Sequence, residues 1–264
     1  MSRNRNRSRD RDCDRNRNHG RNRNCNCDRD RDRGQSNVVA VALLLGVAAA
    51  SMGALTAAVG MVVDSSATQA DADRVAADLE TAVDPVAATG PGRGRVTFAE
   101  GRLHAVERTL EVRADGSVVE RLDVGALVYR AGDRRVALHA GAVVRGTGGR
   151  GWLETEPPVT VDDDVLIVGA PRLGDDVGSA AGTGGVTATV ETNVSHDRRS
   201  LGDATFAVAV ETSAPDAWKR AFEELGATVA REPGEPPTVV ATFGGERTGY
   251  LVVHDLDAEV SAGG

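Results

Sequence analysis

Three patterns of apolar and polar residues follow one another along the chain. The segment 38–63 is almost continuously apolar and holds no charged residue. The next stretch carries apolar side chains at helical spacing, with Val75 and Leu79 on one face, and Asp84-Pro85 ends it. After Pro85 the pattern changes to short runs of alternating apolar and polar residues. The pattern therefore predicts one long helix, from about residue 37 to 83, followed by a β-rich region.

The apolar segment is long enough to cross a membrane. Its 26 residues would form a helix of about 39 Å, at ~1.5 Å per residue, against ~30 Å for the hydrocarbon core of a bilayer. No second apolar stretch of similar length follows. We expect a transmembrane helix over 35–63 and a helical stalk with an exposed surface over 64–84.

The rest of the chain, residues 85–264, predicts a β-sandwich-like head. About ten short runs have strand character, among them 95–100, 117–124, 164–170, 205–212 and 249–260. Asp115-Gly116 is a hairpin turn signal. One helix is expected at 214–226, with Trp218 and Phe222 as core anchors. The fold class is mainly β with one long N-terminal helix.

Residues 1–34 form a dipeptide repeat. Every odd position from 3 to 33 is Arg, Cys or His, and no position from 3 to 34 other than the cysteines is apolar. Such a repeat cannot bury a core, so we expect a disordered leader. All three cysteines of the chain, Cys13, Cys25 and Cys27, lie in it, and their spacing fits no common zinc finger.

Charge divides the chain in the same way. The leader holds 12 Arg and six acidic residues, whereas the whole chain has 31 basic and 39 acidic ones. The region after the leader is therefore strongly acidic, which argues against nucleic acid as its partner. By the positive-inside rule the basic leader lies in the cytoplasm and the head outside the cell.

The junction Arg33-Gly34-Gln35-Ser36 before the apolar run resembles the class III signal peptides of archaeal type IV pilins and archaellins. The wider chain, in RGQSNVVAVALLLG, PGRGRVTF and TSAPDAWKRAFEELGATV, resembles haloarchaeal pilin-like surface proteins, as does its acidic composition. The resemblance implies that a prepilin peptidase cuts between Gly34 and Gln35 and leaves the helix on the mature protein. Many such pilins have an acidic residue early in the helix, whereas the residues from Asn37 onward are uncharged.

Small residues form a stripe along the apolar helix. Gly46, Ala49, Gly53, Ala57 and Gly60 recur at spacings close to whole helical turns. Small residues four apart permit close contact between helices in lipid. The stripe predicts self-association or packing against pilin-like partners, although a Gly/Ala-rich composition also produces it by chance.

Candidate chemistry in the head is sparse. The glycines of 146–151 match a dinucleotide fingerprint, but a strand follows where a helix is needed, so we interpret the segment as a hairpin loop. The acidic runs 162–164 and 175–176 lack calcium-loop spacing. The four histidines after the leader are scattered. We expect no catalytic residue, metal or cofactor; Asn193 begins a glycosylation sequon.

The sequence thus predicts a single-pass, pilin-like cell-surface protein with a structural or adhesive role and no enzymatic activity. Two alternatives stay open. One is a membrane-anchored extracellular binding domain that does not polymerise, and the other is an anchored exported enzyme.

Overall fold

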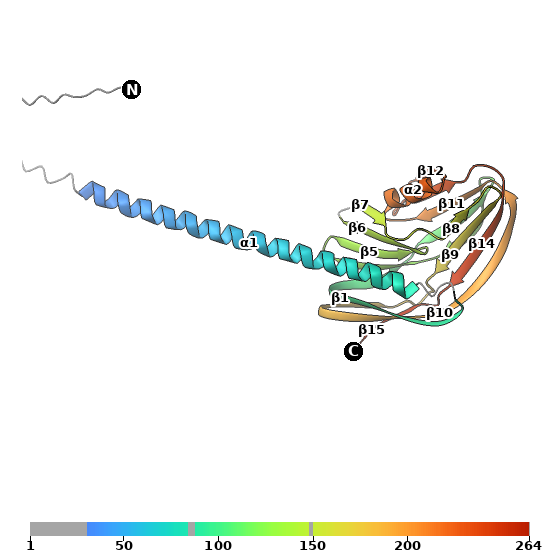
Figure 1. Ribbon diagram of the computed structural model, residues 1–264, viewed down its shortest axis with the longest axis horizontal. Helices are drawn as coiled ribbons and strands as arrows, with labels where there is room; N and C mark the ends of the chain where they lie inside the picture. The colour runs from blue at the N-terminus through green and yellow to red at the C-terminus, as the bar shows by residue number, and fades with distance from the viewer. Residues whose placement is uncertain (1–30, 84–87, 148–149, 264) are drawn as a thin grey trace, which may run out of the picture. The chain divides into compact units, whose positions relative to one another are not determined.

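The computed structural model describes residues 31–83, 88–147 and 150–263 (Figure 1). Within the helix, the side chains of 31–38, 60–65 and 83 are not described. The chain divides into two compact units, residues 1–59 and 60–264. The expected disorder of the leader falls largely outside the described residues, but α1 (Arg31–Val83) begins within its last four positions.

Most strands of the second unit belong to a ten-stranded sheet, called here the large sheet. Nine follow one another in space, and β15 pairs with β10 beside them. In spatial order they are β7 (Arg150–Leu153), β6 (Ala142–Thr147), β5 (Arg134–His139), β4 (Ala126–Ala131), β1 (Gly90–Val106), β10 (Ser179–Ala204), β14 (Arg247–Asp255), β9 (Val165–Arg172) and β8 (Val159–Val161), with β15 at Glu259–Ala262. Neighbours pair antiparallel except β14 and β9, which are parallel.

The small sheet has five strands, all paired antiparallel. Its spatial order is β12 (Thr228–Glu232), β13 (Thr238–Thr242), β11 (Phe206–Glu211), β2 (Thr109–Ala114) and β3 (Ser117–Asp123). The helix α2 (Pro215–Glu224) follows β11 and contacts β7, β12 and β13.

The two sheets pack against each other through one apolar core. Buried residues of β11 and β13 belong to the same cluster as buried residues of β9 and β14. The approach is close at Gly249 in β14, where an added Cβ would overlap the ring of Phe206 in β11. Trp218 and Phe222 of α2 join this core, as the sequence predicted. The head is therefore mainly β with two packed sheets, which confirms the predicted fold class.

A second apolar core lies between the large sheet and the C-terminal part of α1. Ala72, Val75, Ala76 and Leu79 are buried together with residues of β1, β4, β5 and β10. Val75 and Leu79 have no exposed surface. The expectation of an exposed stalk over 64–84 is therefore wrong for this face, because its apolar side chains are buried against the large sheet.

Two carboxylates of α1 hold the strand β1. Asp71 Oδ2 accepts a hydrogen bond of 2.7 Å from the Ala99 amide, and Asp78 Oδ2 accepts one of 2.9 Å from the Thr97 amide. This part of β1 pairs with β10 on one side only, since β4 begins to pair at Arg102. The helix thus satisfies strand-edge donors that would otherwise be exposed or unpaired.

The local signals of the sequence are confirmed where they concern turns and helix α2. Asp115 and Gly116 have positive φ angles of 51° and 81° and join β2 to β3. The predicted strands were right in place but wrong in extent. β10 runs for 26 residues where short strands were expected, and it pairs first with β1 and then with β14.

Candidate functional site

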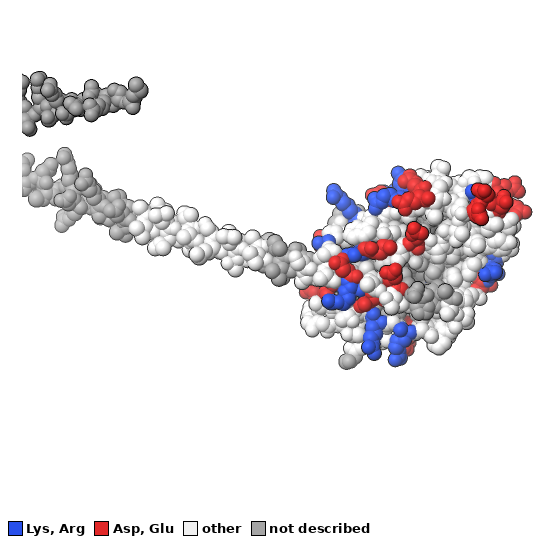
Figure 2. All heavy atoms as spheres, viewed as in Figure 1, with Lys and Arg blue, Asp and Glu red and all other residues white. Residues whose placement is uncertain are grey.

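The first candidate site is the apolar part of α1. Residues Val39–Val59 form a 21-residue stretch that is long and apolar enough to cross a membrane, and none of it is buried in the structure. Its length of about 31 Å, at ~1.5 Å per residue, matches the ~30 Å hydrocarbon core of a bilayer. Figure 2 shows this stretch without a charged side chain. A candidate membrane anchor is therefore present near the N-terminus.

Two hydroxyl groups within this stretch are satisfied inside the helix. Ser51 Oγ donates to the Val47 carbonyl at 2.7 Å, and Thr56 Oγ1 donates to the Met52 carbonyl at 2.9 Å. Hydrocarbon offers no hydrogen-bond partner, so internal bonds of this kind let hydroxyl side chains enter a bilayer.

The sequence-predicted residues of the helix take these positions. Gly34 and Gln35, the predicted cleavage site, lie inside α1, and their side chains are outside the described ones. Gly46, Ala49, Gly53 and Ala57 are exposed, and a Cβ added at Gly46 or Gly53 would meet nothing within 4 Å. Gly60, the last member of the stripe, is again outside the described side chains.

Asn193 of the predicted sequon lies in β10 opposite Pro91 of β1, and its side chain is exposed. Its backbone amide donates to the Leu256 carbonyl at 2.8 Å, so the site lies on a regular strand rather than in a loop. Exposure leaves the side-chain amide accessible to modification.

The structure also shows where the other candidates from the sequence lie. Gly146 and Gly151 pair across the hairpin of β6 and β7, which confirms the predicted hairpin. Within the described part of the chain, no three His, Cys, Asp or Glu residues gather as a metal site would need. His196 and His254 are not scattered, however, because they face each other across β10 and β14 with Nδ1 atoms 2.9 Å apart.

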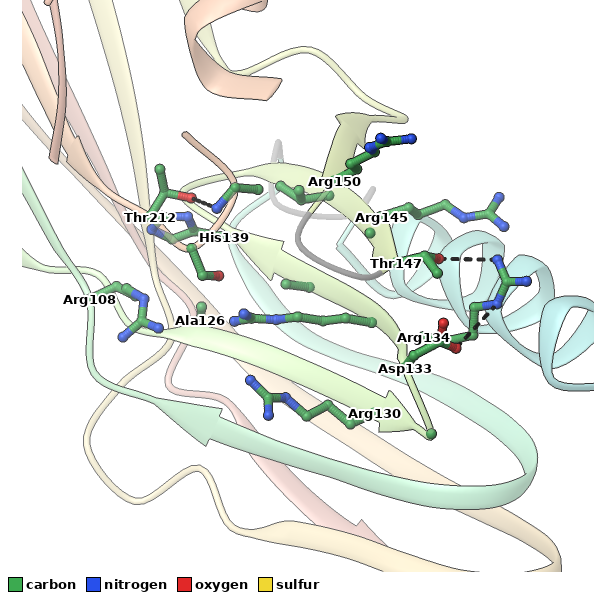
Figure 3. A pocket seen from close by; sticks show the side chains of 17 residues that line it. Arg108, Ala126, Arg130, Asp133, Arg134, His139, Arg145, Thr147, Arg150 and Thr212 are labelled. Carbon is green, nitrogen blue, oxygen red and sulfur yellow. Dashed lines mark hydrogen bonds and ion pairs between the residues drawn. The ribbon is translucent and has the colours of Figure 1, made fainter. Parts of the chain in front are cut away.

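The second candidate site is a cavity that sequence reasoning missed. It has a volume of about 330 Å³, at the lower end of the range for small-molecule sites. Six arginines and one acidic residue, Asp133, line it, together with His139 and Thr212 among others; the arginines are Arg108, Arg130, Arg134, Arg135, Arg145 and Arg150. Figure 3 shows how they surround the cavity.

Two of these arginines, at the outer side, are engaged by neighbouring side chains. Arg134 donates to Thr147 Oγ1 at 3.1 Å. Arg145 pairs with Glu154 at 2.7 Å and also with Asp73 of α1. In Figure 3 the guanidinium groups of Arg134 and Arg145 point away from Arg108.

Three inner arginines, Arg108, Arg130 and Arg135, have a different environment. Arg130 of β4 lies directly opposite Arg135 of β5, and Arg102 of β1 lies opposite Arg130. Directly paired residues of antiparallel strands project from the same face, and like charges in this position repel each other. Arg108, from the connection between β1 and β2, completes the group, and Arg130 extends toward it in Figure 3.

Burial and mutual repulsion lower the pKa values of two of these groups. Desolvation, followed by the charges of Arg130 and Arg108, lowers the pKa of Arg135 to about 10. Desolvation also lowers the pKa of Arg108, against the opposing effect of Glu211. Glu211 is itself held by Thr109, whose amide and hydroxyl donate to it at 3.2 and 3.1 Å. With a pKa of about 10, Arg135 is still charged at neutral pH.

His139 lies deepest among the titratable residues of the cavity. It is 4% exposed, and its Nε2 has no hydrogen-bond partner among the described residues. Its ring packs edge-on against Trp218, with the ring centroids 5.4 Å apart. Burial, followed by the charges of Arg108 and Arg135, lowers the pKa of His139 to about 3. The imidazole is therefore neutral at pH 7.

The arginine pocket is defined here as the inner part of this cavity: Arg108, Arg130, Arg135, His139 and Thr212. The sequence holds these residues in four separate segments, and the pairing of β4 with β5 brings two of them together. The one signal available beforehand was the density of Arg in an acidic head.

Comparison with known proteins assigns the chain to a family. The model of a family of unknown function, DUF7289, matches residues 33–259. The chain belongs to this family. No curated protein and no solved structure matches it. The family match leaves out residues 1–32. It includes the Gly34-Gln35 junction, the apolar helix and nearly all of the head.

Proposed function

We propose that the protein is a pilin-like, single-pass cell-surface protein with a structural or adhesive role, anchored by α1 and exported through a class III signal peptide. One observation carries the proposal: the continuous helix α1 has a fully exposed apolar stretch, Val39–Val59, and then a face buried in the core of the head. The same helix serves the anchor and the folded domain.

The junction before the helix supports the export route. Arg33-Gly34-Gln35 directly precedes the uncharged run, as in the signal peptides that the sequence resembles. The family match begins at Arg33, so the part of the chain shared with the family starts at the same junction. The twelve arginines of the leader support a cytoplasmic N-terminus and an extracellular head. An exposed Asn193 agrees with this orientation.

N-terminal mass spectrometry of the membrane fraction tests the export route. We expect a mature chain that begins at Gln35, and a Gly34→Leu variant that keeps its leader. A Gly46→Leu variant, changed further along the helix, is the matched control and is expected to be processed normally. A wild-type chain that retains its leader, or that is cut after residue 50, would contradict the proposal.

Filament assembly is a separate question from anchoring. We expect Gly53→Leu to abolish sedimentable assemblies, because a bulky side chain would separate helices that pack through the small-residue stripe. Ala48→Leu is the matched control, since it adds the same side chain about half a turn away from the stripe. Equal behaviour of both variants, with no assemblies in the wild type, would favour the alternative of a non-polymerising anchored binding domain. The uncharged start of the helix speaks for that alternative.

A further inference from the structure

We propose that the arginine pocket binds a polyvalent oxyanion, a phosphate or sulfate group, either as the free ion or as an ester of a sugar-sized molecule. The inference is independent of filament formation and of the export route. It rests on the charge, the unpaired donors and the size of the pocket.

The charge of the pocket is not balanced by the protein. Arg108, Arg130 and Arg135 contribute three positive charges, and Glu211 is the acidic group that acts on Arg108. No acidic residue acts appreciably on Arg135 among the described ones. Opposed like charges on neighbouring strands destabilise a fold, and the partial burial of Arg108 and Arg135 adds to this cost. A bound anion would remove both costs.

The concentration of arginine is unusual for this chain. The head is strongly acidic overall, so basic residues on its surface have acidic neighbours available, as Arg145 has with Glu154 and Asp73. Arg130 and Arg135 face each other instead. A site that concentrates positive charge in an acidic surface attracts anions by local rather than net charge.

Two buried nitrogen atoms of residues that line this pocket lack partners. Arg135 Nε and His139 Nε2 are both buried without a hydrogen bond among the described residues. Buried polar atoms of this kind usually have a partner, protein, water or ligand. A guanidinium presents its N–H groups as a planar fork that matches the oxygens of phosphate or sulfate.

The volume of the whole cavity favours an ester over the bare ion. The arginine pocket and the outer part beside Arg134 and Arg145 together have about 330 Å³, room for roughly ten water molecules at ~30 Å³ each. A free phosphate ion would occupy only part of this space, so a sugar-sized body attached to the oxyanion has room beside it. The side chains of Ala126, Ala137 and Val144 form an apolar wall for that body.

The test uses the full chain in detergent micelles and isothermal titration calorimetry at constant, low potassium chloride. The probes are inorganic phosphate, sulfate, glucose 6-phosphate and glucose. We expect one saturable site for the oxyanions and none for glucose. Tighter binding of glucose 6-phosphate than of phosphate would assign the site to an ester, and equal affinities would assign it to the oxyanion alone. No saturable binding of any oxyanion would overturn the proposal.

Substitutions locate the site. Arg135→Met and Arg130→Met each remove one charged donor but keep an apolar stem, and we expect each to weaken binding at least about tenfold. Arg198→Met, at an exposed position of β10, removes the same charge elsewhere and is expected to leave affinity unchanged. Should Arg135→Met fail to fold, Arg130→Met still decides, because Arg130 is an exposed residue. Unchanged affinity in the folded variants would refute the assignment.

Discussion

Acidification should destabilise the head through His139. The pKa of the buried imidazole is lowered to about 3, from 6.5 in an unfolded chain. Between these two values the unfolded state binds more protons than the folded state, so stability decreases as the pH falls below 6.5. At pH 5.0 the unfolded state gains about 2 kcal/mol from protonating this one group, at ~1.36 kcal/mol per pH unit. At pH 7.5 the contribution is negligible.

His139→Phe isolates this contribution, because Phe keeps an aromatic ring beside Trp218 and does not titrate. The melting temperature of wild type and variant is measured by circular dichroism at pH 7.5 and 5.0. Other titrating groups lower the melting temperature of both proteins equally. The difference between the two losses therefore reports the contribution of His139. We expect the wild type to lose about 4–8 °C more than the variant, at 2–4 °C per kcal/mol for a domain of this size. Equal losses of melting temperature in both proteins would refute the conclusion that His139 is buried and neutral.

Three further changes test how α1 supports the head. Leu79→Ala should lower the free energy of unfolding by about 2–5 kcal/mol in thermal melts, since the side chain has no exposed surface. Gly94→Val should destabilise strongly, because an added Cβ would overlap Ala82, and Ala82→Gly in the same chain should recover part of the loss. A truncated chain 66–264 should melt cooperatively, whereas 85–264, which lacks the core face of the helix, should not.

Local signals in the sequence predicted the elements they control. An uncharged apolar run, an Asp-Gly turn and a helix with Pro215 in its first turn each depend on neighbouring residues, and each appears in the structure. Alternation of apolar and polar residues predicted the β-rich head for the same reason. The buried face of α1 was visible as the spacing of Val75 and Leu79, but the sequence did not show that the sheet would fold around it.

Features that depend on strand register were beyond such reasoning. Arg130 and Arg135 meet because a tight turn pairs β4 with β5 in one register, and a shift of one residue would place them on opposite faces. His196 and His254 are 58 positions apart and meet through the same kind of pairing. The role of single residues such as Asp71 was also not visible in the sequence. Asp71 follows the apolar segment in the sequence, whereas in the fold it accepts a hydrogen bond from β1.

The dual role of α1 separates the tests of folding from those of export. Among the described side chains of the helix, the buried core residues lie at or beyond Ala72, and Asp71 accepts a hydrogen bond from β1. A cut at Gln35 lies far before these residues and therefore leaves all of them in the head. The described core contacts thus do not select the processing site, and a mature N-terminus at Gln35 would support recognition of the junction by a peptidase. A different N-terminus would contradict the export route and leave the anion site intact.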